Sequence, residues 1–166
     1  MRIRGATEQD APALAAIVAR CDAEYADWAP ADWQPPPEGF NDELTRIAAR
    51  IADPAARTML AEEVVPIGFI DWRRLDREPQ VAELRSLYVE PRRWARGTGR
   101  ALLRFAQDGM SKAGFASFRL WVPDGDDRAM ALYASEGWSP AGRRRRHDHL
   151  GLDLVGYERS RDRPCE

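Results

Sequence analysis

The chain has 166 residues, 44% of them hydrophobic and 31% charged, and a formal net charge of -2. This length predicts one compact domain over residues 1–166, and the composition excludes an intrinsically disordered chain and a coiled coil. A near-neutral total also argues against a dedicated nucleic-acid binder, whose charge is normally strongly positive.

Cysteine usage and hydropathy indicate a soluble protein of the cytoplasm. Cys21 and Cys165 lie far apart in the sequence, so no disulfide framework is expected. No signal peptide is visible, and no apolar run approaches the roughly 20 residues of a membrane span, so no membrane partner is expected. His147 and His149 have no further ligands at suitable spacing, which argues against a metal site.

The first half of the chain is predicted to mix short strands with two helices. Residues 2–4 form a strand, and Thr7 three positions before Asp10 predicts a capped helix to about Cys21. Residues 22–41 lose periodicity and contain four prolines, which predicts a long functional loop. A helix over 42–51, a hairpin of strands 58–62 and 67–72, and a strand over 81–89 follow.

The second half is predicted to begin with an amphipathic helix over residues 99–112. A strand over 118–122 and a helix over 127–136, closed by Gly137, come next, and the remaining residues form terminal strands. We expect a mixed α/β domain with one central sheet and a core over residues 2–160. Residues 161–166 are expected to form a flexible tail.

A basic, glycine-containing turn joins the strand over 81–89 to the next helix. Glycines such as Gly97 and Gly99 let successive backbone N–H groups point at one spot, and the helix N-terminus adds partial positive charge. The turn therefore predicts a phosphate or pyrophosphate site. Arg100 and Ala101 replace the Lys-Ser/Thr of a P-loop, and Leu102 stands at the third glycine of a Rossmann turn. A plain connection between strand and helix is the alternative.

This turn and a second motif resemble those of the GNAT superfamily of N-acetyltransferases. The family signature, Arg/Gln-x-x-Gly-x-Gly/Ala between a strand and a helix, corresponds to residues 94–99, with Trp94 at its first position. The family's second block, Asn-x-x-Ala-x-x-x-Tyr and then Gly-Phe, corresponds to residues 126–133 and Gly137-Trp138. Asp126 stands where asparagine is usual, and Tyr133 matches the tyrosine.

The resemblance implies an α/β (α+β) domain in which a mixed, mostly antiparallel sheet is flanked by about four helices. It also implies transfer of an acetyl group from acetyl-CoA, by direct attack, to a primary amine of a small molecule or peptide. The residues it implies for the coenzyme are Leu87, Tyr88, Val89, Trp94, Ala95, Arg96, Gly97, Thr98, Gly99, Arg100, Ala101 and Asp126. A catalytically inactive acyl-CoA-binding module is the alternative, which Trp94 and Asp126 favour.

Two residues are assigned to proton transfer. Tyr133, by its match to the family's tyrosine, is expected to donate a proton to the departing thiolate, and a purely structural core role is the alternative. Glu83 is the predicted base, because it lies on the strand that leads to the turn. Alternation places Glu83, Arg85, Leu87 and Val89 on one face unless a bulge intervenes. A solvated or Arg85-paired Glu83, or a water relay, is the alternative.

The segment over residues 22–43 is predicted to bind the amine acceptor. It carries seven acids and four aromatic residues but no lysine or arginine, which suits a cationic amine held over aromatic faces. The residues assigned to the acceptor are Tyr25, Asp27, Trp28 and Trp33. An acidic, solubilising loop whose aromatics cover the core is the alternative.

Charge is distributed unevenly along the chain. Residues 1–90 carry 10 basic and 17 acidic residues, whereas residues 91–166 carry 15 basic and 10 acidic ones. This polarity suits a cationic acceptor and an anionic coenzyme. The run Arg143–Arg146 is expected to be solvated or ion-paired, with a nucleic-acid patch as the alternative. A monomer or a homodimer is expected.

Overall fold

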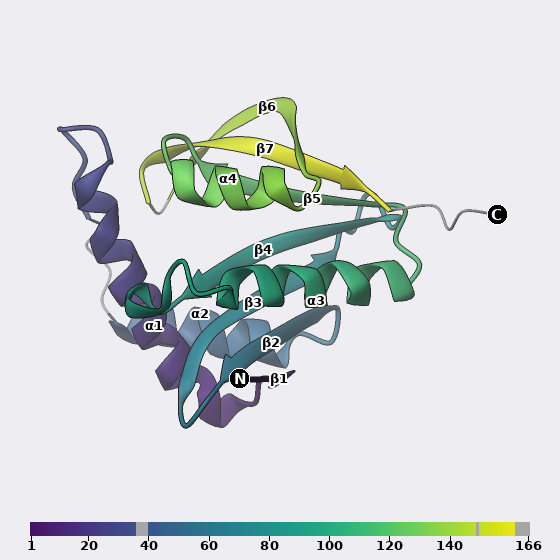
Figure 1. Cartoon of the computed structure of the whole chain (residues 1–166), viewed down its shortest axis with the longest axis horizontal. Coiled ribbons are helices and arrows are strands. Elements are labelled where there is room, and N and C mark those ends of the chain that lie inside the picture. The colour runs from purple at the N-terminus through teal and green to yellow at the C-terminus, as the bar shows by residue number, and fades with distance from the viewer. Residues whose placement is uncertain (36–39, 149, 162–166) are drawn as a thin grey trace.

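A seven-stranded sheet with helices on both faces forms the protein (Figure 1). The computed structural model describes residues 1–35, 40–148 and 150–161. The strands are β1 (Arg2–Gly5), β2 (Ala56–Glu62), β3 (Pro66–Arg74), β4 (Val81–Val89), β5 (Ser117–Pro123), β6 (Ser139–His147) and β7 (Leu152–Ser160). Their order is β1-β2-β3-β4-β5-β7-β6, and β4 and β5 form a parallel pair among antiparallel ones. This confirms the predicted mixed, mostly antiparallel sheet.

Four α-helices cover the two faces of the sheet. They are α1 (Ala11–Ala23), α2 (Phe40–Ala52), α3 (Thr98–Lys112) and α4 (Asp127–Ser135). On one face α1 packs Leu14 against the strands that carry Leu60 and Phe69. On the other face α3 buries Leu102 and Leu103 in a second cluster, which α4 joins through Tyr133 and neighbouring residues. Each fully buried leucine contributes about 1.5–3 kcal/mol to folding.

The entry into α1 is held as the sequence predicts. The Asp10 carboxylate accepts hydrogen bonds from the Thr7 backbone N–H at 2.8 Å and from the Thr7 hydroxyl at 2.9 Å. Two guanidinium contacts from Arg4 hold the same carboxylate and lower its pKa below the usual range. A short 3-10 helix, η1 (Glu8–Asp10), therefore leads directly into α1.

The predicted loop over residues 22–41 is wrong at both ends. Helix α1 continues to Ala23 and a 3-10 turn, η2 (Glu24–Asp27), follows it, while α2 begins at Phe40. Helical hydrogen bonding can continue because the first proline, Pro30, comes only after η2. Residues 36–39 lie outside the described part of the chain.

The sheet opens where β4 and β5 separate. The two strands pair only from Val81 with Ser117 to Leu84 with Leu120. Beyond that point the Leu87–Val89 end of β4 pairs with β3 alone, while the end of β5 pairs with β7. Figure 1 shows the two strands diverging beside the start of α3 and beside α4. One edge of β4 therefore has unpaired backbone groups at this opening.

A β-bulge in β4 corrects the predicted side-chain alternation. Ser86 pairs with Asp71 and Leu84 pairs with Trp72, so Arg85 is the extra residue. Leu84 and Leu87 both pack in the cluster beneath α3, although strict alternation places them on opposite faces. The physical reason is a buried ion pair, because Arg85 turns to hold the fully buried Asp71 carboxylate, which also accepts from Thr58.

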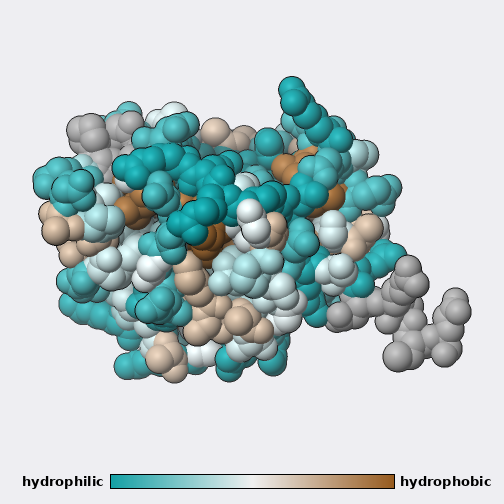
Figure 2. Space-filling view, turned by 90° about the horizontal axis from the view of Figure 1, so that it is seen from above, coloured by the Kyte–Doolittle hydropathy of each residue, from teal (hydrophilic) through white to brown (hydrophobic). Residues whose placement is uncertain are grey.

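The arginine run on β6 is held by acids and an aromatic ring. Arg144 pairs with Asp124, Arg146 pairs with Asp153 at 3.0 Å, and Arg145 lies 4.5 Å above the Trp121 ring. The face over β6 and β7 is mainly hydrophilic (Figure 2). This confirms the prediction of solvated or ion-paired arginines.

In the described ranges, no helix is long and apolar enough to cross a membrane, and no group of three metal-ligating side chains is found. His149 and residues 162–166 of the predicted tail lie outside the described residues. Arg161 donates its backbone N–H to the Ala116 carbonyl at 3.0 Å, so the described chain stays attached to the sheet up to that residue.

Candidate active site

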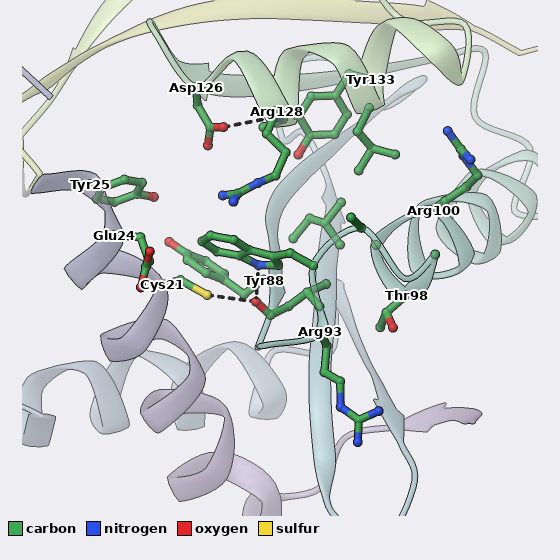
Figure 3. Close-up of a pocket in the computed structure, with 18 of the residues that line it drawn as sticks. Cys21, Glu24, Tyr25, Tyr88, Arg93, Thr98, Arg100, Asp126, Arg128 and Tyr133 are labelled. Atoms are coloured by element: carbon green, nitrogen blue, oxygen red, sulfur yellow. Dashed lines mark hydrogen bonds between the residues drawn. The ribbon is translucent and has the colours of Figure 1, made fainter. Parts of the chain in front are cut away.

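A cavity of about 400 Å³ lies where β4 and β5 separate (Figure 3). Its walls come from the end of β4 with the following turn, from α4, and from the end of α1 with η2. The predicted residues that line it are Tyr25, Trp28, Leu87, Tyr88, Val89, Trp94, Ala95, Gly97, Thr98, Gly99, Arg100, Asp126 and Tyr133. The cavity thus joins the predicted coenzyme segment to the predicted acceptor segment.

The turn between β4 and α3 presents free backbone donors to this cavity. A 3-10 turn, η3 (Pro91–Arg93), leads to Ala95 and Gly97, which adopt φ angles of 58° and 86°. The first helical bond runs from the Ala101 N–H to the Gly97 carbonyl at 2.9 Å. The N–H groups of Thr98, Gly99 and Arg100 therefore precede the helical ladder and are available to an anion.

The basic side chains of this turn differ in what they contact. Arg93 and Arg100 line the cavity, and each also pairs with an acid at 2.8 Å, Glu63 and Glu136 respectively. Arg96 and Ala101, both predicted to bind the coenzyme, lie outside the lining. The groups of this turn that an anion could contact are therefore chiefly its backbone N–H groups and the helix N-terminus.

Trp94 folds back against β4. Its indole Nε1 donates to the Val89 carbonyl at 2.7 Å, and Cys21 donates its thiol to the same oxygen at 3.2 Å. The Arg128 guanidinium of α4 lies 3.1 Å from the Trp94 ring centroid, a cation–π contact. Trp94, the side chain at the family's Arg/Gln position, thus holds Arg128 at the cavity, in addition to Arg93 and Arg100.

Cys21 is a structural thiol. Burial raises its pKa to about 12, and the charges of Asp22 and Glu90 add to the rise. The thiolate is the reactive form of cysteine, so this side chain stays an unreactive thiol at neutral pH. For Cys21 this agrees with the prediction that it does not act as a nucleophile, while Cys165 lies outside the described residues.

Tyr133 is both a core residue and a cavity residue. It is 6% exposed and packs by ring contacts against Trp138 and Tyr157, while Figure 3 shows its hydroxyl directed into the cavity. Burial raises its pKa, and the Asp126 charge raises it further. The hydroxyl therefore stays protonated and can act as a donor. Asp126 caps α4 by accepting the Ala129 N–H at 3.0 Å.

The wall predicted to bind the acceptor, called the acceptor wall below, consists of the end of α1 and η2. Glu24, Tyr25 and Trp28 line the cavity, and the Tyr25 ring meets the Trp28 ring edge-on at 5.2 Å. Trp33 lies behind Tyr25 and donates its indole N–H to the Leu150 carbonyl at 2.7 Å, outside the lining. Asp27 is exposed and also lies outside it.

Glu83 lies away from this cavity. It stands in register with Arg73 of β3 and Arg119 of β5, at the end of β4 where β5 is still paired. It is not among the residues that line the cavity. The bulge at Arg85 lies between Glu83 and the Leu87–Val89 end of the strand.

Six lining residues were not predicted. They are Cys21, Glu24, Arg93, Arg128, Ala129 and Leu132. Arg128, Ala129 and Leu132 fall inside the second motif. Ala129 lies four residues before Tyr133, and Arg128 four residues before Leu132, so helical spacing was a usable signal. Cys21 stands at the predicted end of the first helix, whereas Glu24 reaches the cavity because α1 and η2 extend beyond that boundary, which no local motif indicated.

The chain is similar in sequence to one known protein family. Residues 22–138 match the model of the acetyltransferase (GNAT) family. Among curated proteins, none matches the chain significantly.

Three solved structures have a similar fold over nearly the whole chain. A ribosomal-protein-alanine N-acetyltransferase from Brucella melitensis is 23% identical, with a TM-score of 0.74 and coverage of 96% of this chain and 99% of that one. The ribosomal-protein-S18-alanine N-acetyltransferase from Escherichia coli is 20% identical, with a TM-score of 0.70 and coverage of 99% and 96%. A PaiA N-acetyltransferase from Thermoplasma acidophilum, in complex with coenzyme A, is 21% identical, with a TM-score of 0.67 and coverage of 96% and 98%.

Proposed function

The chain belongs to the acetyltransferase (GNAT) family, and from this premise we propose that it moves an acetyl group from acetyl-CoA to a primary amine of a small molecule or peptide. The observation that carries the proposal is the single cavity in which a backbone anion cradle, a buried tyrosine and an acidic, aromatic wall meet. One ligand would be anionic and the other cationic. The cavity holds a wall suited to each.

The coenzyme fits the basic side of the cavity. The free N–H groups of Thr98, Gly99 and Arg100 suit its pyrophosphate, and Arg128 adds a cation close by. The edge of β4 at Leu87–Val89 has no strand partner there, and its backbone groups other than the Val89 carbonyl, which Trp94 and Cys21 already engage, suit the amides of the pantetheine arm. Thioester carbon and acceptor nitrogen would then meet near the Tyr133 hydroxyl. When bound, the coenzyme supplies the activated acetyl group.

The acceptor fits the opposite side. Glu24 supplies a carboxylate at the wall, and the rings of Tyr25 and Trp28 supply faces for a cation. An amine with a pKa of about 10.4 is protonated at neutral pH, so it arrives as an ammonium ion. The acids and the aromatic faces of this wall both attract the ammonium form of the acceptor.

Acetyl transfer by direct attack requires two proton movements. The amine nitrogen, once it has lost a proton, forms the bond to the carbonyl carbon while the carbon–sulfur bond breaks. Tyr133 gives its hydroxyl proton to the departing sulfur and regains one from the nitrogen, so the products are an amide and a thiol. A backbone N–H on the open edge of β4 would stabilise the negative charge on the carbonyl oxygen.

The test is a thiol-release assay with acetyl-CoA and a panel of polyamines, aminoglycosides, amino acids and peptides. We expect saturable thiol release with at least one primary amine and a product heavier by one acetyl group. Binding of acetyl-CoA without amine-dependent thiol release would support the inactive module instead. Failure of both binding and release would overturn the proposal.

A further inference from the structure

A second hollow, which we call the α3 groove, lies between the C-terminal half of α3 and the strands β2 and β3. Figure 1 shows α3 lying over these strands, and the helix contacts both of them. The groove has a volume of about 490 Å³, which is within the range of small-molecule sites. None of the residues that line it also lines the cavity of the candidate active site. The α3 groove is therefore a separate place on the protein.

The groove exists because α3 ends in small residues where it lies over the strands. Gly109 and Ala113 follow Phe105 at four-residue spacing, so the three share one side of the helix end. A Cβ on Gly109 would lie 3.2 Å from Cζ2 of Trp72, so the glycine lets the Trp72 ring lie directly against α3. The short side chains at 109 and 113 leave the space beside this ring open. Four larger apolar residues form the walls: Met59, Trp72, Phe105 and Phe115.

Trp72 carries a hydrogen-bond donor that the protein itself does not use. The residue is only 6% exposed, and its indole N–H has no hydrogen-bond partner among the described residues. This nitrogen is not one of the fully enclosed polar atoms, so it reaches the surface. Buried tryptophans usually hydrogen-bond through this group. The groove thus combines aromatic walls with a free donor.

Two arginines on the neighbouring strands give the groove a positive charge. Arg57 stands opposite Trp72 in the β2–β3 register, and Arg74 follows two residues later on the same face. Among the described residues neither forms an ion pair, and Arg57 donates only to the backbone carbonyls of Ala56 and Pro54, at 2.8 and 3.3 Å. Long side chains at diagonal positions of a sheet face reach each other, so the two like charges repel. An anion bound between them would remove this repulsion.

Acids of the adjoining segments do not neutralise these arginines. Asp53 accepts a backbone N–H at 2.9 Å, and Asp108 on α3 pairs with Lys112 at 2.7 Å. Asp76, two residues after Arg74, forms no ion pair within the described part of the chain. The residues that line the groove include no acid. Its charge is therefore positive.

We propose that the α3 groove binds a small carboxylate that has an apolar body. Arg57 and Arg74 hold the carboxylate, and the apolar body lies against Trp72, Phe105 and Phe115. A neutral molecule would leave the two positive charges uncompensated, and a cation would be repelled. Because the groove shares no lining residue with the cavity, this ligand and the coenzyme can be bound together. The proposal goes beyond the proposed function and does not depend on it.

The first experiment is calorimetry on the full chain with octanoate, in the presence and absence of saturating CoA. Octanamide is the matched control, because it has the same body without the charge. We expect octanoate to bind about tenfold more tightly than octanamide, since charged donors hold its carboxylate. The octanoate Kd should change by less than about twofold when CoA is added, because the two sites are separate.

Variants test the charge and the apolar wall separately. Arg57→Gln and Arg74→Gln should each weaken octanoate binding about fivefold and leave octanamide binding unchanged. Arg77→Gln removes an exposed arginine outside the groove and should change neither affinity. Phe105→Ala should weaken both probes about threefold, because it removes part of the apolar wall. The Phe105 ring is 41% exposed, so its loss should leave the fold intact.

Indole signals in ¹H–¹⁵N NMR spectra locate the bound probe. We expect octanoate to shift the indole signal that is missing in Trp72→Phe. The signal that is missing in Trp121→Phe should stay in place, because Trp121 lies outside the groove and outside the cavity.

The proposal is overturned by the absence of octanoate binding or by equal affinities for octanoate and octanamide. Loss of octanoate binding on addition of CoA would also overturn it, because the probe would then lie in the cavity. A dimer that dissociates in Phe105→Ala, without octanoate binding in the wild type, would show that a second copy of the chain covers the groove instead.

Discussion

The two walls of the cavity would recognise the proposed ligands by different means. The coenzyme wall is made of backbone N–H groups at the start of α3, and its arginines at positions 93 and 100 are already neutralised by acids. The acceptor wall is made of side chains from α1 and η2, and Asp22, which lies next to the lining residue Cys21, has a buried oxygen without a partner among the described residues. On the coenzyme wall, we expect the binding free energy to depend on the conformation of the backbone. On the acceptor wall, we expect it to depend on the charge and protonation of side chains.

This difference predicts how each wall responds to mutation. Side-chain changes on the coenzyme wall should matter mainly when they move the backbone, whereas on the acceptor wall the removal of one charge should alter rate, stability or affinity.

Tyr133 stands where the two walls meet, so its change should have the largest effect on rate. We expect Tyr133→Phe to lower kcat about 100-fold, because the departing sulfur loses its proton donor. The affinity for acetyl-CoA, measured by calorimetry, should stay within about twofold, since the ring packing is preserved. Tyr157→Phe removes a hydroxyl from a neighbouring buried ring outside the cavity and should leave kcat unchanged. Equal rates in both variants would assign Tyr133 to the core alone.

The carboxyl group of Asp22 should make the free energy of unfolding depend on pH. The folded-state pKa of Asp22, about 7, lies above its ordinary value of 3.8, so the folded protein binds the extra proton and loses stability as the pH rises from about 4 to 7. A shift of about three units corresponds to about 4 kcal/mol, and partial exposure reduces this to about 2 kcal/mol.

We therefore expect Asp22→Asn to be about 2 kcal/mol more stable than wild type at pH 8 and equally stable near pH 4. Urea unfolding at the two pH values measures this difference. Asp108→Asn should show no such pH dependence, because its carboxyl group is exposed. Lower stability of Asp22→Asn at pH 8 would mean that its carboxylate has a favourable partner in the folded state.

Gly97 tests whether the coenzyme wall depends on backbone conformation. Its φ of 86° is strained for any side chain, while a Cβ there would meet no atom within 4 Å. Gly97→Ala should cost about 1 kcal/mol of stability and, by shifting the N–H groups that follow, weaken acetyl-CoA binding about tenfold.

Gly114, at the other end of α3, is the matched control. It has a φ of 87° and equally open surroundings, so Gly114→Ala should lose the same stability without affecting acetyl-CoA affinity. Denaturation and calorimetry on the two variants measure both quantities. An equal loss of affinity would show that the effect comes from general destabilisation rather than from the cradle.

The same contrast explains which features could be predicted from the sequence. A glycine spacing dictates local backbone conformation, so the turn over residues 94–99 and the start of α3 followed from a few adjacent residues. The capping box at Thr7 and Asp10 is local in the same way, as is the position of Tyr133 on α4.

Features that depend on contacts between distant segments escaped prediction. The bulge at Arg85 exists because Asp71, on the neighbouring strand, is fully buried and needs a cation. The position of Trp94 depends on the Val89 carbonyl and on Arg128 of α4. Glu83 is predicted as a base from its place on the strand, but strand alternation does not show where β4 and β5 separate. That point is set by the pairing of the whole sheet, and Glu83 lies on the side of it where the two strands are still paired.

Replacement of Glu24 should have the smallest effect on the kinetics, and it can be compared directly with replacement of another acid of the same segment. It lines the cavity, whereas Asp32 is an exposed acid of the same segment outside it. We expect Glu24→Gln to raise the acceptor KM about fivefold, or about 1 kcal/mol, by removing a carboxylate near the ammonium ion. Asp32→Asn should change the acceptor KM by less than about twofold. Both values are measured by steady-state kinetics at about 50 mM salt.

Salt distinguishes the two ways in which these acids can act. A long-range field is largely screened at 0.5 M salt, while a contact at a partly enclosed wall is screened less. The KM difference between Glu24→Gln and wild type should therefore survive high salt. If both variants raise KM equally at low salt and neither does so at high salt, the segment attracts the acceptor through its summed charge. The acceptor wall would then lack a specific contact at Glu24, and its selectivity would have to come from the aromatic rings of Tyr25 and Trp28.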